Sequence, residues 1–292
     1  MRSNRQMLLS DNRLPIFLLD DSIIGEAPSQ SSGIDIVDLA LDIFGEALHI
    51  QIAYRDCQAT LADIMPVARL LSSKIIQIAL SNLHCNGVTV PCAKGCIAHC
   101  CSFLVPLSVP ELFQLKDDII AMPQSQRKRI VRKSTLAARC ILKSPPPGIF
   151  ADKSENPSYN ETERIPLISH WYANLELACP FLNEPEKTCG IYNHRPLACR
   201  EYFVTTHPSQ CARGSSDADI VELPVSITEV LGQMTSNLEY YTEAEAVMAP
   251  LVLLWCQNNM SRAKRSWPAK QLVENFVEAV HNKIEERCAV RN

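Results

Sequence analysis

Apolar residues recur every three or four positions over much of the chain, which is the period of an α-helix. One such pattern spans residues 34–48, and another spans residues 61–78, where Pro66 marks either a helix start or a kink. An apolar stripe at this spacing lets one side of a helix pack against its neighbours. Both segments are therefore predicted to be helices that support the core.

Further helices are marked by their first residues or by their composition. Ser108 and Glu111 form a capping box, and Ser226 with Glu229 forms another, so a helix is expected to follow each pair. The C-terminal segment has apolar residues at steps of four, from position 272 to position 284. The other predicted helices cover residues 125–142 and 168–177.

These patterns, together with only 9 glycines in 292 residues, predict a mainly α protein. Residues 1–33 are polar and irregular, apart from a short apolar run at 16–19 that could form a strand, and are expected to be an N-terminal leader. Residues 34–292 are expected to form a single mainly helical domain. A chain of this length can bury a full hydrophobic core.

Composition and charge exclude several classes of protein. The net charge of -4 argues against a general nucleic-acid binder, which is usually basic. The leader lacks both the long apolar core and the cleavage site of an export signal. No segment approaches the ~18 uninterrupted apolar residues of a membrane span. We therefore expect a cytoplasmic protein that binds neither nucleic acid nor membrane.

The chain has 13 cysteines, and seven of them fall in two blocks. Stable disulfides are uncommon in a reducing compartment, so clustered thiols indicate metal binding or catalysis. The first block reads C-x3-C-x3-C-C, and the second places three cysteines over residues 179–199. Thiolates suit zinc and iron–sulfur clusters. The predicted metal ligands are Cys92, Cys96, Cys100, Cys101, Cys179, Cys189 and Cys199.

Residues 85–215 are thus expected to form an irregular, cysteine-rich metal-binding core within the helical domain. The spacing does not distinguish an iron–sulfur cluster from zinc. It also leaves open which four thiols bind directly and whether two centres share the seven.

The other cysteines and the histidines are expected to have ordinary structural roles. Cys211 is either an eighth ligand or a spare thiol, and His99 is the best candidate among the histidines because it adjoins Cys100. Free cysteine behaves as a small apolar residue, so isolated cysteines are expected to be buried. The cysteines interpreted in this way are Cys57, Cys85, Cys140, Cys256 and Cys288.

Two arginines and one tyrosine are predicted neighbours of the metal site. Four thiolates on a divalent ion leave a net negative charge, which nearby cations and N–H donors stabilise. Arg195 and Arg200 bracket Cys199. They could supply the positive charge that balances the thiolates, hold an anionic group or bridge loops. Tyr192 could donate to a thiolate, although burial as a core aromatic is the expected alternative.

These residues resemble a known family, the YkgJ-type cysteine-cluster proteins. The resemblance rests on the first cysteine block, on the downstream Ser-x-x-Glu, on Cys-Pro-Phe-Leu at 179–182 and on Cys-Gly-Ile-Tyr-x-x-Arg-Pro-Leu-x-Cys-Arg at 189–200. It covers residues 92–200 and implies a zinc- or iron-chelating domain. The chain departs from the pattern by a long insert between its two blocks.

The same signature is similar to one in flagellin lysine N-methylases. That similarity implies an enzyme that uses an iron–sulfur cluster and S-adenosylmethionine to methylate protein lysines. The chain, however, shows no glycine-rich strand–loop–helix for S-adenosylmethionine. The preferred interpretation is therefore metal binding without an assigned reaction.

The predicted helix over residues 125–142 carries six Lys and Arg residues and no acidic residue. It could meet an acidic partner or nucleic acid. Without interleaved aromatic residues, a solvated face is the expected role, and a protein substrate or partner remains an open possibility. The pattern does not indicate an oligomeric state.

Overall fold

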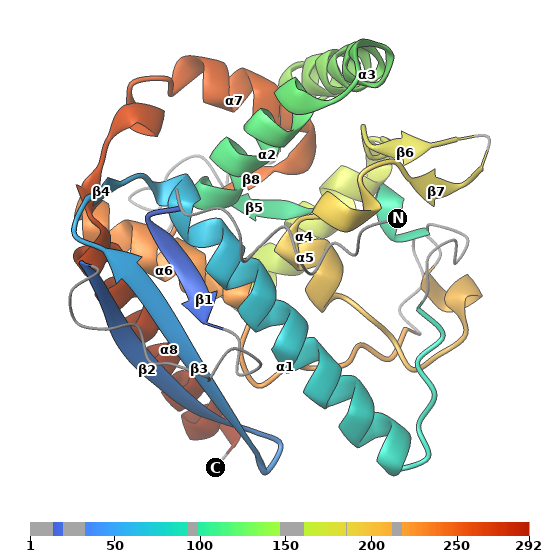
Figure 1. The fold of residues 1–292 in the computed structure, drawn as a ribbon. Helices are drawn as coiled ribbons and strands as arrows, with labels where there is room; N and C mark the ends of the chain where they lie inside the picture. The colour runs from blue at the N-terminus through green and yellow to red at the C-terminus, as the bar shows by residue number, and fades with distance from the viewer. Residues whose placement is uncertain are drawn as a thin grey trace. The chain divides into compact units, whose positions relative to one another are not determined.

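The computed structural model describes residues 14–19, 33–92, 99–146, 161–184, 186–211 and 218–291 (Figure 1). Contacts divide the chain into two compact units. Unit 1 comprises Met1–Ala79, Pro224–Glu245 and Ser261–Asn292, and unit 2 comprises Leu80–Leu223 and Ala246–Met260. Compact units need not fold independently, so the single domain expected over residues 34–292 stays a prediction.

Unit 1 contains a three-stranded antiparallel sheet in the order β1-β3-β2. The strands are β1 (Ile16–Leu19), β2 (Ile34–Ile43) and β3 (Glu46–Arg55). The short strand expected at residues 16–19 is confirmed. The helix predicted over residues 34–48 is wrong, because this segment forms a β-hairpin.

The hairpin follows from a two-residue period that the helical interpretation overlooked. Leu39, Leu41 and Ile43 are buried, while the side chains between them are exposed. Phe44 and Gly45 both have positive φ, 58° and 83°, and form the tight turn. Over this short run the apolar positions fit both the two-residue period of a strand and the period of a helix. The tight turn at Phe44 and Gly45 favours the strand.

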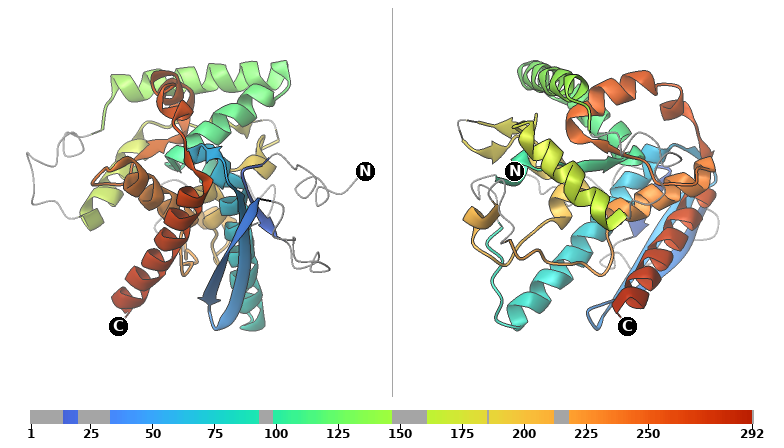
Figure 2. Two further views of the ribbon diagram at one scale, coloured as in Figure 1. Left: turned by 60° about the vertical axis from the view of Figure 1, so that its left-hand side comes forward. Right: turned by 180° about the vertical axis from the view of Figure 1, so that it is seen from behind.

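Helices of unit 1 pack against this sheet and against one another. The 3-10 helix η3 (Leu61–Ile64) leads into α1 (Met65–Cys85), and α6 (Ile227–Glu239) packs on α8 (Ala269–Arg291). Helix α8 also contacts β2 and β3 (Figure 2). Strands β4 (Gln58–Ala59) and β9 (Trp267–Pro268) form a small antiparallel pair. The helices predicted over residues 61–78, after Ser226 and over residues 272–284 are confirmed as α1, α6 and α8.

The segment Leu61–Cys85 is long and apolar enough, by length and composition, to cross a membrane. Arg69 and Lys74 interrupt it, and 44% of its most apolar window is buried inside the structure. A core helix of a soluble protein meets the same criteria. The expectation that the protein binds no membrane stays a prediction.

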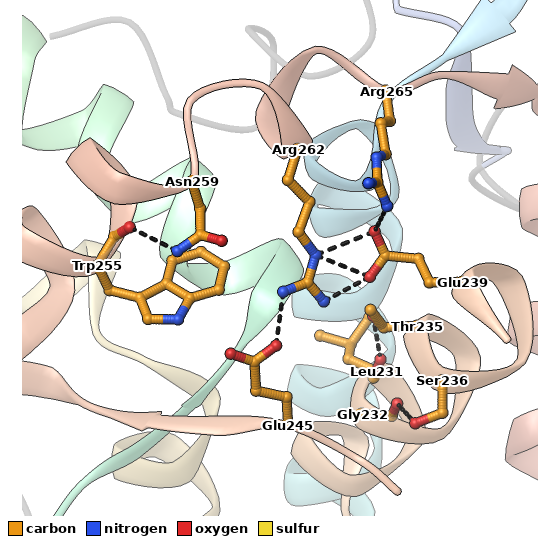
Figure 3. A network of polar contacts seen from close by, with 10 residues as sticks. All are labelled: Leu231, Gly232, Thr235, Ser236, Glu239, Glu245, Trp255, Asn259, Arg262 and Arg265. Carbon is orange, nitrogen blue, oxygen red and sulfur yellow. Dashed lines mark hydrogen bonds and ion pairs between the residues drawn. The ribbon is translucent and has the colours of Figure 1, made fainter. Parts of the chain in front are cut away.

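A buried ionic network ties the end of α6 to η9 (Arg262–Lys264) in unit 1 (Figure 3). Arg262 donates to both carboxylate oxygens of Glu239 and to Glu245, and Arg265 donates to Glu239. The Glu239 side chain is 0% exposed and that of Arg262 is 9% exposed. The guanidinium of Arg262 also lies 5.3 Å from the ring centroid of Tyr241. Two carboxylates thus balance two guanidiniums.

Unit 2 is built from helices with short strand pairs between them. Strand β5 (Pro106–Ser108) pairs with β8 (Ala246–Met248), and β6 (Leu182–Asn183) pairs with β7 (Thr188–Cys189). The α-helices are α2 (Val109–Ala121), α3 (Gln124–Lys143), α4 (Glu161–Asn174), α5 (Leu197–Glu201) and α7 (Val252–Asn258). The short 3-10 helices are η4 (His99–Ser102), η6 (Tyr192–His194), η7 (Pro208–Cys211) and η8 (Ala249–Leu251).

The helix predicted over residues 125–142 is confirmed as α3. The helix predicted over residues 168–177 begins earlier, at Glu161, and ends at Asn174. In the residues that the structure describes, helices make up most of the regular structure. The mainly α prediction therefore holds in outline, and the strands are what it missed.

Candidate metal centre

Five of the seven predicted thiols line one cavity in unit 2. They come from both sequence blocks and from separate elements: η4, the turn before β6, β7 and α5. The cavity measures about 60 Å³, room for several water-sized groups. We call it the thiol cavity; its cysteines are Cys100, Cys101, Cys179, Cys189 and Cys199.

A backbone hydrogen bond joins the two cysteine blocks. The amide N–H of Cys179 donates to the carbonyl of Cys101 at 2.7 Å. The chain then turns into the β6–β7 hairpin, in which Leu182 pairs with Cys189. These main-chain bonds bring thiols nearly eighty positions apart in the sequence to one place.

Gly190 directly follows strand β7, at a point where the chain passes too close to the neighbouring segment to leave room for a side chain. A Cβ at this position would lie 2.9 Å from the Phe181 carbonyl oxygen and 3.0 Å from Asn183 Oδ1. The Gly190 amide donates to that same carbonyl at 2.8 Å. The glycine therefore allows the chain to pass directly from Cys189 toward η6.

Helix α3 supports the hairpin from outside. Lys133 Nζ donates to the Leu182 carbonyl at 2.9 Å and pairs with Glu184 at 2.8 Å. Gln126 Nε2 donates to the Gly190 carbonyl at 3.1 Å. One part of the basic helix is thus structural, which differs from the purely solvated face that the sequence favoured.

Glu111 holds the segment that carries Cys199. Its buried carboxylate accepts from Ser108 N at 3.1 Å and from Ser108 Oγ at 2.9 Å, which confirms the capping box of α2. The other oxygen, Oε1, accepts from Leu197 N at 2.7 Å, in the first turn of α5. One carboxylate therefore fixes both helix starts, a role that the sequence alone assigned only to α2.

The thiols of Cys100, Cys101 and Cys179 lie close enough together to shift the pKa of Cys100 and of Cys101. The contact with Cys101, followed by burial, raises the pKa of Cys100 well above its usual value. The contact with Cys100 lowers the pKa of Cys101, but the contact with Cys179 and burial outweigh it and raise that pKa to about 12. Close packing of thiols thus favours the protonated forms of Cys100 and Cys101.

Burial also raises the pKa of Cys189 and, more strongly, that of Cys199. Arg195 acts in the opposite direction and lowers the pKa of Cys100, Cys189 and Cys199. A bound cation would oppose the effect of burial far more strongly, because thiolates are the form that ligates metal.

Arg195 and Tyr192 both line the thiol cavity. The Arg195 guanidinium lies 4.0 Å from the centroid of the Tyr192 ring, and its buried Nε has no hydrogen-bond partner among the described residues. Tyr192 is half-buried rather than fully buried, so the alternative of a core aromatic is wrong. Stacking on the ring holds the guanidinium in the wall of the cavity.

Arg200 has a different role from Arg195. Its Nε donates to the Arg195 carbonyl at 3.0 Å, and Nη2 donates to the Asn193 carbonyl at 2.5 Å. It does not belong to the lining of the thiol cavity. Of the three roles that the sequence left open for Arg200, the described contacts are those of a loop bridge.

Residues 91–213 match the family model CxxCxxCC. This family carries the description "Putative zinc- or iron-chelating domain". The match covers both cysteine blocks and supports a metal-binding role for this part of the chain. Searches of curated proteins and of solved structures found no match.

Within the matched region, two predicted ligands and Cys211, the possible eighth ligand, lie outside the cavity lining or outside the described residues. Cys92 is exposed, and its Sγ accepts from Val204 N at 3.4 Å. Cys211 is buried beside Tyr202, whose pKa is raised to about 12 by burial and by the thiols around it. Cys96 lies outside the described residues, so its role as a ligand stays a prediction.

The histidines do not contribute to the cavity lining in the part of the chain that is described. His84, His170, His194 and His207 are exposed, and His194 Nδ1 lies 3.3 Å from a carboxylate oxygen of Asp118. The side chain of His99 lies outside the described residues. The lining also includes two polar residues that the sequence did not single out, Lys187 and Thr188. They lie next to Cys189, and only that position could have indicated them.

The five cysteines interpreted as ordinary buried residues do not share one environment. Cys256 is buried and its thiol donates to the Leu112 carbonyl at 3.4 Å, as expected. The other four are exposed, so the expectation of burial is wrong for them. Their helices and loops present them to solvent rather than to the core. These exposed cysteines are Cys57, Cys85, Cys140 and Cys288.

The thiol cavity is not arranged as a finished ligand set. Among the described residues, no three Cys, His, Asp or Glu side chains stand together in positions that could hold one ion. The thiols would have to turn toward a common point to do so. The donor set nevertheless fits zinc or iron, because five soft sulfur donors and a cation share one cavity.

Proposed function

We propose that the protein binds zinc or an iron–sulfur cluster through four of the five thiols in the cavity. The observation that carries this proposal is the convergence of thiols from two distant sequence blocks on one cavity. Zinc and iron–sulfur clusters both take four thiolates, so five candidates suffice for a single centre. A cytoplasmic location, where the thiols stay reduced, agrees with this proposal.

The supporting contacts favour a site built for a bound group. Glu111 anchors α5, the Cys179–Cys101 backbone bond joins the blocks, and α3 holds the β6–β7 hairpin. Arg195 would balance part of the negative charge of a thiolate centre and could donate a hydrogen bond from Nε to one sulfur. No reaction is needed to explain these features. The similarity to flagellin lysine N-methylases, with S-adenosylmethionine as cofactor, stays a prediction.

Purification without oxygen, followed by metal and acid-labile sulfide analysis, tests the proposal. Stoichiometric zinc without sulfide would identify a zinc centre, whereas iron with sulfide and visible absorbance would identify a cluster. The Cys179→Ser variant should lose the bound metal, and Cys85→Ser, an exposed cysteine outside the cavity lining, is the matched control. A protein that stays folded and takes up neither zinc nor an iron–sulfur cluster on reconstitution would refute the proposal.

A further inference from the structure

Helix α3 has a second, outward side that the proposed metal site does not use. Its inner side is buried and apolar, and Lys133 and Gln126 hold the β6–β7 hairpin. The opposite side is exposed and carries basic and apolar side chains together. We call this the outer face of α3; it comprises Lys128, Val131, Arg132, Leu136, Arg139, Leu142 and Lys143.

The cations of the outer face form a ridge along the helix. Lys128, Arg132 and Arg139 stand at positions i, i+4 and i+11, which places them within about 40° of one line. Lys143 extends the ridge, giving a length of roughly 22 Å at 1.5 Å per residue. These four side chains have no hydrogen bond or ion pair to any described residue. Helix α3 contains no Asp or Glu to neutralise them.

Apolar side chains flank the ridge on both sides. Val131 is 42% exposed and Leu142 is 65% exposed, and both lie on one side, whereas Leu136, 51% exposed, lies on the other. A solvated helix face would not need large apolar residues beside its charges. Their combination with a row of unpaired cations indicates a surface that contacts another molecule.

We propose that the outer face of α3 binds an acidic, amphipathic segment of a partner protein. The ridge offers charge complementarity to carboxylates, and the flanking residues offer contacts for apolar side chains of the same segment. In a chain of net charge -4, this concentration of positive charge would also orient the partner during the encounter. This proposal does not depend on the metal centre.

The same observations argue against two other occupants. A nucleic-acid surface for single strands would offer aromatic residues for stacking, and α3 has none. A helix that lies in a membrane surface buries its wide apolar side in lipid. In α3 that side is already buried within unit 2 at Ile130, Ala137 and Ile141.

A direct binding measurement tests the proposal on the full-length protein. The probe is a labelled 20-residue peptide with Glu and Leu at helical spacing, titrated at about 150 mM salt. A matched peptide with Gln in place of Glu, a single-stranded RNA and phosphatidylserine vesicles serve as comparisons. We expect the acidic peptide to bind and the Gln peptide to bind at least about tenfold more weakly. Absence of acidic-peptide binding, or tighter binding of RNA or vesicles, would overturn the proposal.

Charge-reversal variants locate the surface. Arg132→Glu with Arg139→Glu should weaken peptide binding at least about tenfold. Lys264→Glu with Lys270→Glu changes the net charge equally at exposed positions of unit 1 and should leave binding within about twofold. Leu136→Ser should weaken binding by about threefold if the apolar flank takes part. Equal loss of binding in the two double variants would show that peptide binding depends only on overall net charge, and would contradict the proposal. Metal content should stay unchanged in all three variants, which separates this test from that of the metal site.

Discussion

The ionic network of unit 1 and the partly buried thiol cavity of unit 2 are two polar clusters that differ in how fully their groups are paired. In the network, two carboxylates and two guanidiniums satisfy one another (Figure 3). In the cavity, five thiols face one guanidinium whose Nε has no hydrogen-bond partner among the described residues. Buried polar groups are normally satisfied. The difference indicates that the network is purely structural, while the cavity is suited to a further group.

Glu239→Ala should have the largest effect on stability. It would leave the buried Arg262 with the partly exposed Glu245 as its remaining carboxylate partner in the network. Breaking a buried ion pair costs about 3–5 kcal/mol of the free energy of unfolding. Urea denaturation measures the loss. Glu274→Gln, which removes an exposed i,i+4 pair with Lys270, is the control and should cost less than about 1 kcal/mol. Similar costs for both variants would show that burial does not set the strength of the network.

Cys199→Ser should affect the thiol cavity through its bound metal, whereas the ionic network needs no metal. If a structural metal contributes about 10–16 kcal/mol through four thiolates, each ligand supplies roughly 3 kcal/mol. The variant should therefore lose bound metal and the stability that comes with it. The exposed Cys288 provides the control, since Cys288→Ser should retain full metal content. Loss of metal in the control but not in the Cys199 variant would show that the wrong cysteines were chosen.

Glu111→Gln should weaken the metal site without removing a thiol. The carboxylate accepts hydrogen bonds from both Ser108 and Leu197, so its loss should cost about 1–3 kcal/mol of stability and also loosen α5. Chelator competition measures the metal affinity, and thermal denaturation measures the stability. Ser108→Ala removes only the capping side chain, so it should cost about 1 kcal/mol and leave metal affinity nearly unchanged. Equal affinities in the two variants would show that the bond to Leu197 does not position Cys199.

Arg195→Gln should have the smallest of these effects. Removing the positive charge beside the thiols should lower metal affinity by about tenfold, a change typical of residues that support metal ligands. Arg195→Lys keeps the charge but not the planar stacking on Tyr192, so it should recover part of the affinity. The salt dependence of metal affinity gives a second measurement. This salt dependence should become weaker in Arg195→Gln and stay unchanged in Arg195→Lys. An unchanged affinity in Arg195→Gln would place the arginine in a structural role instead.

The sequence was informative where one local signal was sufficient. The capping boxes at Ser108 and Ser226 located two helix starts, and the stripe from Leu272 located α8. Such signals succeed because the hydrogen bonds and apolar contacts concerned lie within a few residues. The β2–β3 hairpin was missed because its short apolar run fits two periods, and the strands are selected by the positive-φ turn at Phe44 and Gly45, the pairing of β3 with β1 and the packing of both strands against α8.

For the candidate site, the sequence by itself indicated the chemistry: clustered thiols, a nearby arginine and a resemblance to a zinc- or iron-chelating domain. The tertiary structure decided which of these residues meet. It brought five thiols to one cavity, directed Arg195 into the wall and turned Arg200 toward the loop backbone. It also gave Glu111 and α3 their supporting roles. The physical reason is that residue type sets what a side chain can bind, whereas convergence depends on backbone hydrogen bonds between segments far apart in the chain.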